Sequence, residues 1–221
     1  MLKTNQAVLF DLDGTLVDTA RDLGAALNHV LQLHGQPVTH YEQYRPVASH
    51  GVRGLLQLGF GDALATYPYD LLRQQFLDYY QQHNGDTSVL FPGGDELLAF
   101  LRSEQIPWGI VTNKPYRFAA QICRALQLND CRILIGGDSL HVRKPDPIPL
   151  WVAAHQLGVP PADCWYLGDA ERDIEAGRRA GMQTVLAGFG YLADSDQPDL
   201  WQADCRIDSL LQLTDFLHKS V

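Results

Sequence analysis

The stretch that decides the fold is Ala7-Val8-Leu9-Phe10-Asp11-Leu12-Asp13-Gly14-Thr15-Leu16. A short apolar run that ends at polar, turn-forming residues is typical of a buried strand, so we predict a strand over 7–10. In an open α/β sheet the ligand crevice lies outside the carboxyl ends of the strands, where this order places Asp11 and Asp13. An isolated Asp-x-Asp is usually a solvated turn, so its meaning depends on the rest of the chain.

The rest of the chain repeats this strand pattern. Apolar runs predict further strands over 108–111, 133–135, 165–167 and 184–186. Segments with helical spacing lie between them: one begins after Pro115, and one ends before Gly181. The alternation of strands and helices predicts an α/β fold with a parallel sheet.

One interval, 16–90, breaks the alternation. It contains no run that predicts a strand, but it contains two amphipathic helical faces. The faces are Leu23, Leu27, Val30 and Leu31, then Leu72, Phe76, Tyr79 and Tyr80. We predict a catalytic core made of 1–15 and 91–221 and a helical cap over 16–90, inserted after the first strand like a lid.

Net charge and composition disfavour several classes of binding partner. The chain has 221 residues, 46% of them hydrophobic, and a net charge of −9. That charge disfavours nucleic acid or an anionic membrane surface as a partner, so an anionic substrate must be caught locally. No apolar run is long enough to span a membrane, and the four cysteines form no CxxC pair, so we expect a cytoplasmic protein in a reducing compartment. The oligomeric state is left open.

Three later motifs give meaning to the first. Thr112-Asn113-Lys114-Pro115 follows a predicted strand and leads into a helix, whose free N–H groups can hold an anion. Lys144-Pro145 precedes another helix, and Gly168-Asp169 ends a further strand, with Asp173 four residues later. Strand ends therefore supply acids and a hydroxyl, with a loop lysine beside them.

This ordered set resembles the haloacid dehalogenase superfamily, and within it the phosphoglycolate phosphatase group. The four motifs span Asp11 to Asp173. The segments around Glu171-Arg172-Asp173 and Trp108-Gly109-Ile110 are also similar to the N-acetylmuramic acid 6-phosphate phosphatases. The resemblance implies a Rossmann-like core with a mobile cap, phosphatase activity and Mg²⁺ as cofactor.

The chemistry of phosphate ester hydrolysis gives these residues roles. Asp11 is the expected nucleophile, which forms an aspartyl-phosphate, and Asp13 the expected acid and then base for the leaving alcohol and the water. Thr112 and Asn113 are expected to hold phosphoryl oxygens, and Lys144 to offset negative charge. The alternatives without a catalytic role are that Asn113 caps the following helix and that Lys144 is a surface lysine.

A metal site is expected at the same place. Mg²⁺ prefers oxygen ligands in octahedral geometry, and Asp11, the Asp13 carbonyl and Asp169 provide them. Asp173 is expected to support the ligands through hydrogen bonds, or simply to stabilise a helix N-terminus.

The substrate is expected to be a small phosphorylated metabolite, best 2-phosphoglycolate. Arg53, flanked by glycines in the cap, is the candidate for binding a substrate carboxylate, although it could equally be an exposed arginine. N-acetylmuramic acid 6-phosphate or another sugar phosphate is the alternative, and a phosphomutase could use the same motifs. A dehalogenase or a phospho-accepting signalling domain would not need Asp13.

Overall fold

The core of the computed structural model, which describes residues 6–219, is a six-stranded parallel sheet in the order β5-β4-β1-β6-β7-β8. The strands are β1 (Ala7–Phe10), β4 (Trp108–Val111), β5 (Ile133–Ile135), β6 (Cys164–Gly168), β7 (Gln183–Ala187) and β8 (Cys205–Ile207). The predicted α/β class with a parallel Rossmann-like sheet is confirmed. All five predicted strands are present, β6 and β7 being one residue longer at each end. β8 was not predicted because only Ile207 of its three residues is buried, at the sheet edge.

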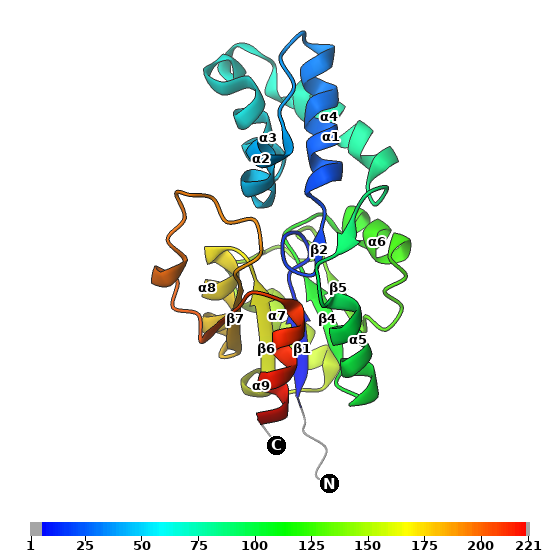
Figure 1. Cartoon of the computed structure of the whole chain (residues 1–221), viewed down its shortest axis with the longest axis vertical. Coiled ribbons are helices and arrows are strands. Elements are labelled where there is room, and N and C mark those ends of the chain that lie inside the picture. Colours follow the sequence, from blue (N-terminus) through cyan, green and yellow to red (C-terminus); the bar gives the residue numbers. More distant parts are fainter. Residues whose placement is uncertain (1–5, 220–221) are drawn as a thin grey trace.

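Helices cover both faces of this sheet (Figure 1). They are α5 (Gly94–Ser103), α6 (Tyr116–Ala125), α7 (Ile148–Leu157), α8 (Glu171–Ala180) and α9 (Leu213–Lys219), with short 3₁₀ turns η3 (Pro161–Asp163), η4 (Pro198–Leu200) and η5 (Leu210–Gln212). Because side chains alternate along a strand, Ala7 and Leu9 pack in one cluster with α7 and α8, while Val8 and Phe10 pack in another with α5 and α9. β1 is therefore buried on both faces.

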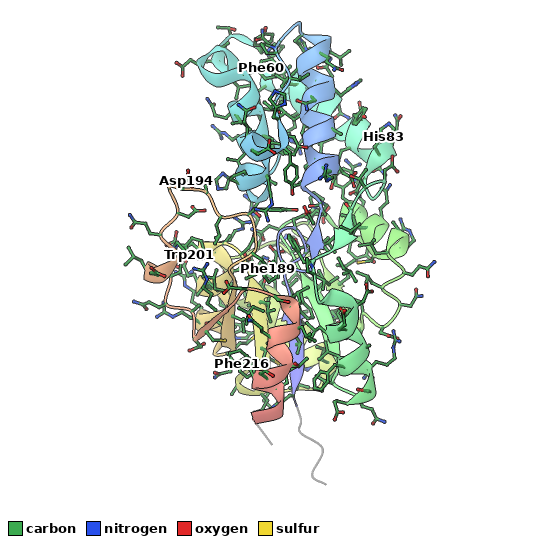
Figure 2. All side chains as sticks on the ribbon, viewed as in Figure 1. Phe60, His83, Phe189, Asp194, Trp201 and Phe216 are labelled. Carbon is green, nitrogen blue, oxygen red and sulfur yellow. The ribbon has the colours of Figure 1, made fainter. Side chains whose placement is uncertain are left out.

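The insertion forms a helical cap. It contains α1 (Ala20–Leu33), α2 (Tyr41–Tyr44), η1 (Arg45–His50), α3 (Gly51–Phe60), η2 (Gly61–Thr66) and α4 (Tyr69–His83). Figure 1 shows these helices at the top, beyond the carboxyl end of β1, and Figure 2 places Phe60 at their far end and Phe216 at the opposite end of the molecule. Within residues 6–219, no helix has the length and apolar character needed to cross a membrane.

A two-stranded ribbon joins cap and core. β2 (Val17–Asp18) pairs antiparallel with β3 (Val89–Leu90), and Val17 faces Leu90. No strand was predicted here, because two residues are too few to show a period. The buried Asp22 fixes the ribbon, since its carboxylate accepts hydrogen bonds from Gly85 N, Thr87 N and Ser88 Oγ. The division into cap and core at 16 and 90 remains a prediction.

Candidate active site

The central position of β1 builds the site. β1 pairs with β4 on one side and β6 on the other, so the residues that follow these three strands meet at one edge. Asp11 follows β1 and its N–H donates to Leu167 O of β6 at 2.8 Å. Thr112 follows β4 and Asp169 follows β6, so the topology brings together Asp11, Thr112 and Asp169, all of them buried.

Asp11 lies in a strongly charged environment. Burial raises its pKa, but Lys144 and then Arg172 lower it, with further hydrogen bonds from Lys144 and Thr112, so that the pKa falls below its ordinary value of 3.8. The Lys144 ammonium lies 2.9 Å from Asp11 Oδ1. Asp11 is therefore ionised at neutral pH, which is the form a nucleophile needs.

Lys144 is held from three directions. Its Nζ contacts Asp11, Asp173 Oδ1 at 2.7 Å and Tyr166 Oη at 2.8 Å, and its side chain is 1% exposed. The main chain of its loop is fixed by Asn113, whose Nδ2 donates to Lys144 O at 2.9 Å. Lys144 is thus a buried residue of the site, and Asn113 positions it.

The acids form a cluster that fits a hard cation. Asp11, Asp169 and Asp173 each offer a carboxylate oxygen within 4.8 Å of the other two. Asp169 Oδ1 is buried and has no hydrogen-bond partner among the described residues. Burial, then the nearby charges of Asp173 and Asp11, raise the pKa of Asp169 to about 7. Without a bound cation, the cluster therefore disfavours a negative charge on all three carboxylates. An all-oxygen donor set with an orphaned carboxylate oxygen suits Mg²⁺.

Asp173 has two contacts that explain its burial. Besides the ion pair with Lys144, its Oδ2 accepts a hydrogen bond from Ala170 N at 3.1 Å, which caps the start of α8. Both roles considered from the sequence, helix stabilisation and support of the site, are therefore compatible with its contacts.

Asp13 is paired with a lysine to which the sequence argument gave no role. Lys114 Nζ lies 2.8 Å from Asp13 Oδ1 and donates to Tyr80 Oη of α4 at 2.7 Å. Thr19 Oγ1 donates to the same Asp13 oxygen at 2.5 Å. The signal in the sequence was Lys114 itself, an ionisable residue at a strand end, but its pairing with a cap tyrosine depends on tertiary structure.

The cap also reaches the acidic cluster. Ser49 Oγ of η1 donates to Asp169 Oδ2 at 3.1 Å, and Arg172 Nη2 donates back to Ser49 O at 3.1 Å. Arg45 of η1 donates to Phe189 O and Gly190 O in the core. These contacts hold η1 against the carboxyl edge of the sheet.

Close packing around Asp169 requires glycine at one position. Gly14 has φ of +80°, which favours glycine, and a Cβ there would overlap the Asp169 carboxylate. Tyr191 N donates to Asp169 Oδ2 at 2.8 Å, so three segments converge on this side chain.

A cavity of about 430 Å³ opens beside Asp169 and Arg172, between η1 and the loop that carries Trp201. Figure 2 labels Asp194 and Trp201 on this loop. Arg53 lies exposed on α3 and does not line this cavity. Of the predicted site residues, only Asp169 lines this cavity. Contacts or short distances connect Asp11, Lys144, Asp173, Asn113 and Asp169 with one another, whereas no such contact is found for Arg53 among the described residues.

Comparison with known proteins places this arrangement in a family. Residues 8–187 match the family model of the haloacid dehalogenase-like hydrolases. The chain is 41% identical to an N-acetylmuramic acid 6-phosphate phosphatase of Pseudomonas aeruginosa, over 98% of this chain and 96% of the relative. It is 44% identical to a phosphoglycolate phosphatase of Xanthomonas campestris pv. campestris, over 94% of each chain.

Solved structures give the same result. The crystal structure of a predicted phosphoglycolate phosphatase from Haemophilus somnus superimposes with a TM-score of 0.86 at 25% identity, covering 98% of this chain and 100% of the other. The chain therefore belongs to the haloacid dehalogenase-like hydrolase family and is a phosphatase within it.

Proposed function

We propose that the protein hydrolyses a small phosphomonoester through an aspartyl-phosphate on Asp11, in a reaction that depends on Mg²⁺. The observation that carries the proposal is the state of Asp11: a buried carboxylate at the end of the central strand, with a lysine at 2.9 Å and a lowered pKa. A covalent intermediate divides a difficult displacement into two easier steps. The Asp11 oxygen that attacks phosphorus takes over the bond from the departing alkoxide.

Asp13 is proposed to handle the proton. It is half-buried, two residues from the nucleophile, and it donates its proton to the leaving alkoxide, then accepts one from the water that hydrolyses the phosphoenzyme. Thr112 and the N–H groups after it bind phosphoryl oxygens, with Asn113 beside them. Lys144 offsets the charge gathered on Asp11 and the phosphoryl group.

Mg²⁺ would be held by Asp11, the Asp13 carbonyl and Asp169, with Asp173 supporting the site through Lys144. When bound, the ion neutralises phosphoryl charge and orients the ester. The support for this set is the orphaned Asp169 oxygen together with the raised pKa of Asp169. The remaining ligand positions suit water and phosphate oxygen.

The proposed substrate is 2-phosphoglycolate, and the alternative is N-acetylmuramic acid 6-phosphate. Relatives named for each substrate resemble the chain to a similar degree, 44% and 41% identity. Both substrates carry a carboxylate in addition to the phosphate. Arg53 is proposed to pair with this carboxylate when the cap closes, because a guanidinium binds carboxylates through two parallel hydrogen bonds.

Substitution of the nucleophile tests the mechanism. Asp11→Asn should abolish turnover and the acid-stable phosphoenzyme, whereas Asp13→Ala should slow turnover but let phosphoenzyme accumulate with an activated ester. Ca²⁺ should not replace Mg²⁺, because its looser coordination shell can take both oxygens of Asp11. Near-normal activity of Asp11→Asn would refute the covalent mechanism. A need for a bisphosphate activator, with slow release of phosphate to water, would identify a phosphomutase instead.

A further inference from the structure

Two lysines of the site differ in how many partners their ammonium groups have. Both Lys144 and Lys114 are buried. An ammonium carries three N–H donors. The ammonium of Lys144 lies at ion-pair distance from Asp11 and Asp173 and donates a hydrogen bond to Tyr166 Oη.

Lys114 has fewer partners. Within the described part of the chain its Nζ is matched by Asp13 Oδ1 and Tyr80 Oη, which leaves one N–H direction for a ligand. Its side chain is 6% exposed, while that of Asp13 is 15% exposed, so the Asp13 end of the pair is the more accessible one. A buried ammonium with one unmatched donor beside an acid favours an additional anionic partner.

We propose that Lys114 binds the substrate's own carboxylate from the core, in addition to Arg53 from the cap, and that Lys114 selects esters in which this carboxylate lies next to the ester oxygen. The inference rests on the proposed function and deepens it. Lys114 and the leaving oxygen share Asp13 as a partner: Lys114 lies at 2.8 Å from it. The leaving oxygen must come within about 2.6 to 3.2 Å of the same carboxylate.

Ordinary bond lengths allow the carboxylate of 2-phosphoglycolate to reach Lys114. Two groups that share one hydrogen-bonding carboxylate lie roughly 5 to 6 Å apart. In 2-phosphoglycolate a single CH₂ separates the ester oxygen from the carboxyl carbon, so a carboxylate oxygen lies roughly 3 Å from the ester oxygen. With the carboxylate oxygen directed toward Lys114, the remaining gap is roughly 3 Å, which is an ion-pair distance. In N-acetylmuramic acid 6-phosphate the sugar ring separates the two groups, so its carboxylate would lie well beyond Lys114.

Tyr80 gives the cap a part in this recognition. Its Oη accepts a hydrogen bond from the Lys114 ammonium, which also lies 4.8 Å from the centre of the Tyr80 ring. Tyr80 belongs to α4 and Lys114 to the core, so a carboxylate bound here would contact both. Closing of the cap over a carboxylated ester would then leave the ammonium without contact to water.

The test compares two esters that differ at one group: 2-phosphoglycolate and 2-hydroxyethyl phosphate, in which CH₂OH replaces the carboxylate. Lys114→Gln should lower kcat/KM for 2-phosphoglycolate roughly tenfold to a hundredfold more than for 2-hydroxyethyl phosphate, mainly through KM. The ester without a carboxylate also reports whether the variant is folded. The control variant Arg117→Gln removes a positive charge from an exposed position three residues further along the chain, and it should affect kcat/KM for the two esters equally.

Tyr80→Phe provides a second variant that keeps the ring. It should lower kcat/KM for 2-phosphoglycolate severalfold more than for 2-hydroxyethyl phosphate. Equal losses on both esters in Lys114→Gln, or wild-type enzyme that does not prefer 2-phosphoglycolate, would overturn the inference and leave the phosphatase mechanism standing. Failure of wild-type enzyme to hydrolyse either ester with Mg²⁺ would instead refute the proposed function.

Discussion

Replacement of Lys144 by methionine should destabilise the protein in a way that depends on pH. The ammonium pairs with Asp11 at 2.9 Å and Asp173 at 2.7 Å, and all three side chains are at most 4% exposed. Methionine fills a similar volume but leaves two buried carboxylates without their cation. Removal of one partner from a buried ion pair costs about 3 to 5 kcal/mol of unfolding free energy.

The pKa values determine how this loss of unfolding free energy changes with pH. In the wild type the pKa of Asp11 lies below 3.8, so its ionised form contributes stability at neutral pH that is lost only as pH falls through that lowered pKa. Without Lys144, burial moves the pKa of Asp11 upward and raises that of Asp173 further. The variant's deficit should therefore be small near about pH 4 and should grow as pH rises to about 8.

Urea unfolding followed by circular dichroism, in the presence of a chelator, measures this deficit at both ends of the pH range. Arg179→Met is the matched control, since the Arg179–Glu175 pair lies on the surface of α8 with side chains 54% and 40% exposed. That pair should contribute no more than about 0.5 kcal/mol. A Lys144→Met deficit equal to that of the control, or one that does not change with pH, would refute the account of the buried cluster.

Two further predictions concern Asp169. Gly14→Ala should weaken Mg²⁺ binding, because a φ of +80° costs a residue other than glycine about 1 kcal/mol or more and the new methyl group displaces the Asp169 carboxylate. Calorimetry measures the affinity, and an unchanged affinity would mean that Asp169 does not hold the ion. Because the pKa of Asp169 is raised to about 7, Mg²⁺ binding should release close to one proton near about pH 6 and almost none near about pH 8.5. Calorimetry in buffers of different ionisation enthalpy counts these protons, and equal release at both pH values would contradict the raised pKa.

Much of the fold could be predicted from short-range pattern. Runs such as Trp108–Val111 are continuously apolar because both faces of a parallel strand are buried, and that signal does not depend on distant residues. β8 escaped prediction for the opposite reason: with only Ile207 buried, its pattern is that of a loop. The cap helices were visible from their apolar faces, but the β2–β3 ribbon that joins them to the core was not.

The candidate site was most readily predictable where its residues stand at strand ends. Asp11 and Asp169 carry that signal, and the geometry places them together. Ser49 and Tyr80 do not, because a serine in a 3₁₀ turn and a tyrosine on an amphipathic helix look like ordinary cap residues. Their contacts with Asp169 and Lys114 join positions 120 and 34 residues apart, which no local pattern encodes.

The β2–β3 ribbon makes the cap an exchangeable module. Because Val17 and Leu90 are paired across it, the chain leaves the core and returns to it at neighbouring points, and to the sheet the whole cap is equivalent to one hairpin turn. An insertion of different length or composition could replace it without moving β1, β4 or β6. The cap's contribution to the pocket can then change separately from the core, since the residues proposed to cleave the ester stay in the core while Ser49 and His50 of the cavity wall arrive with the insert.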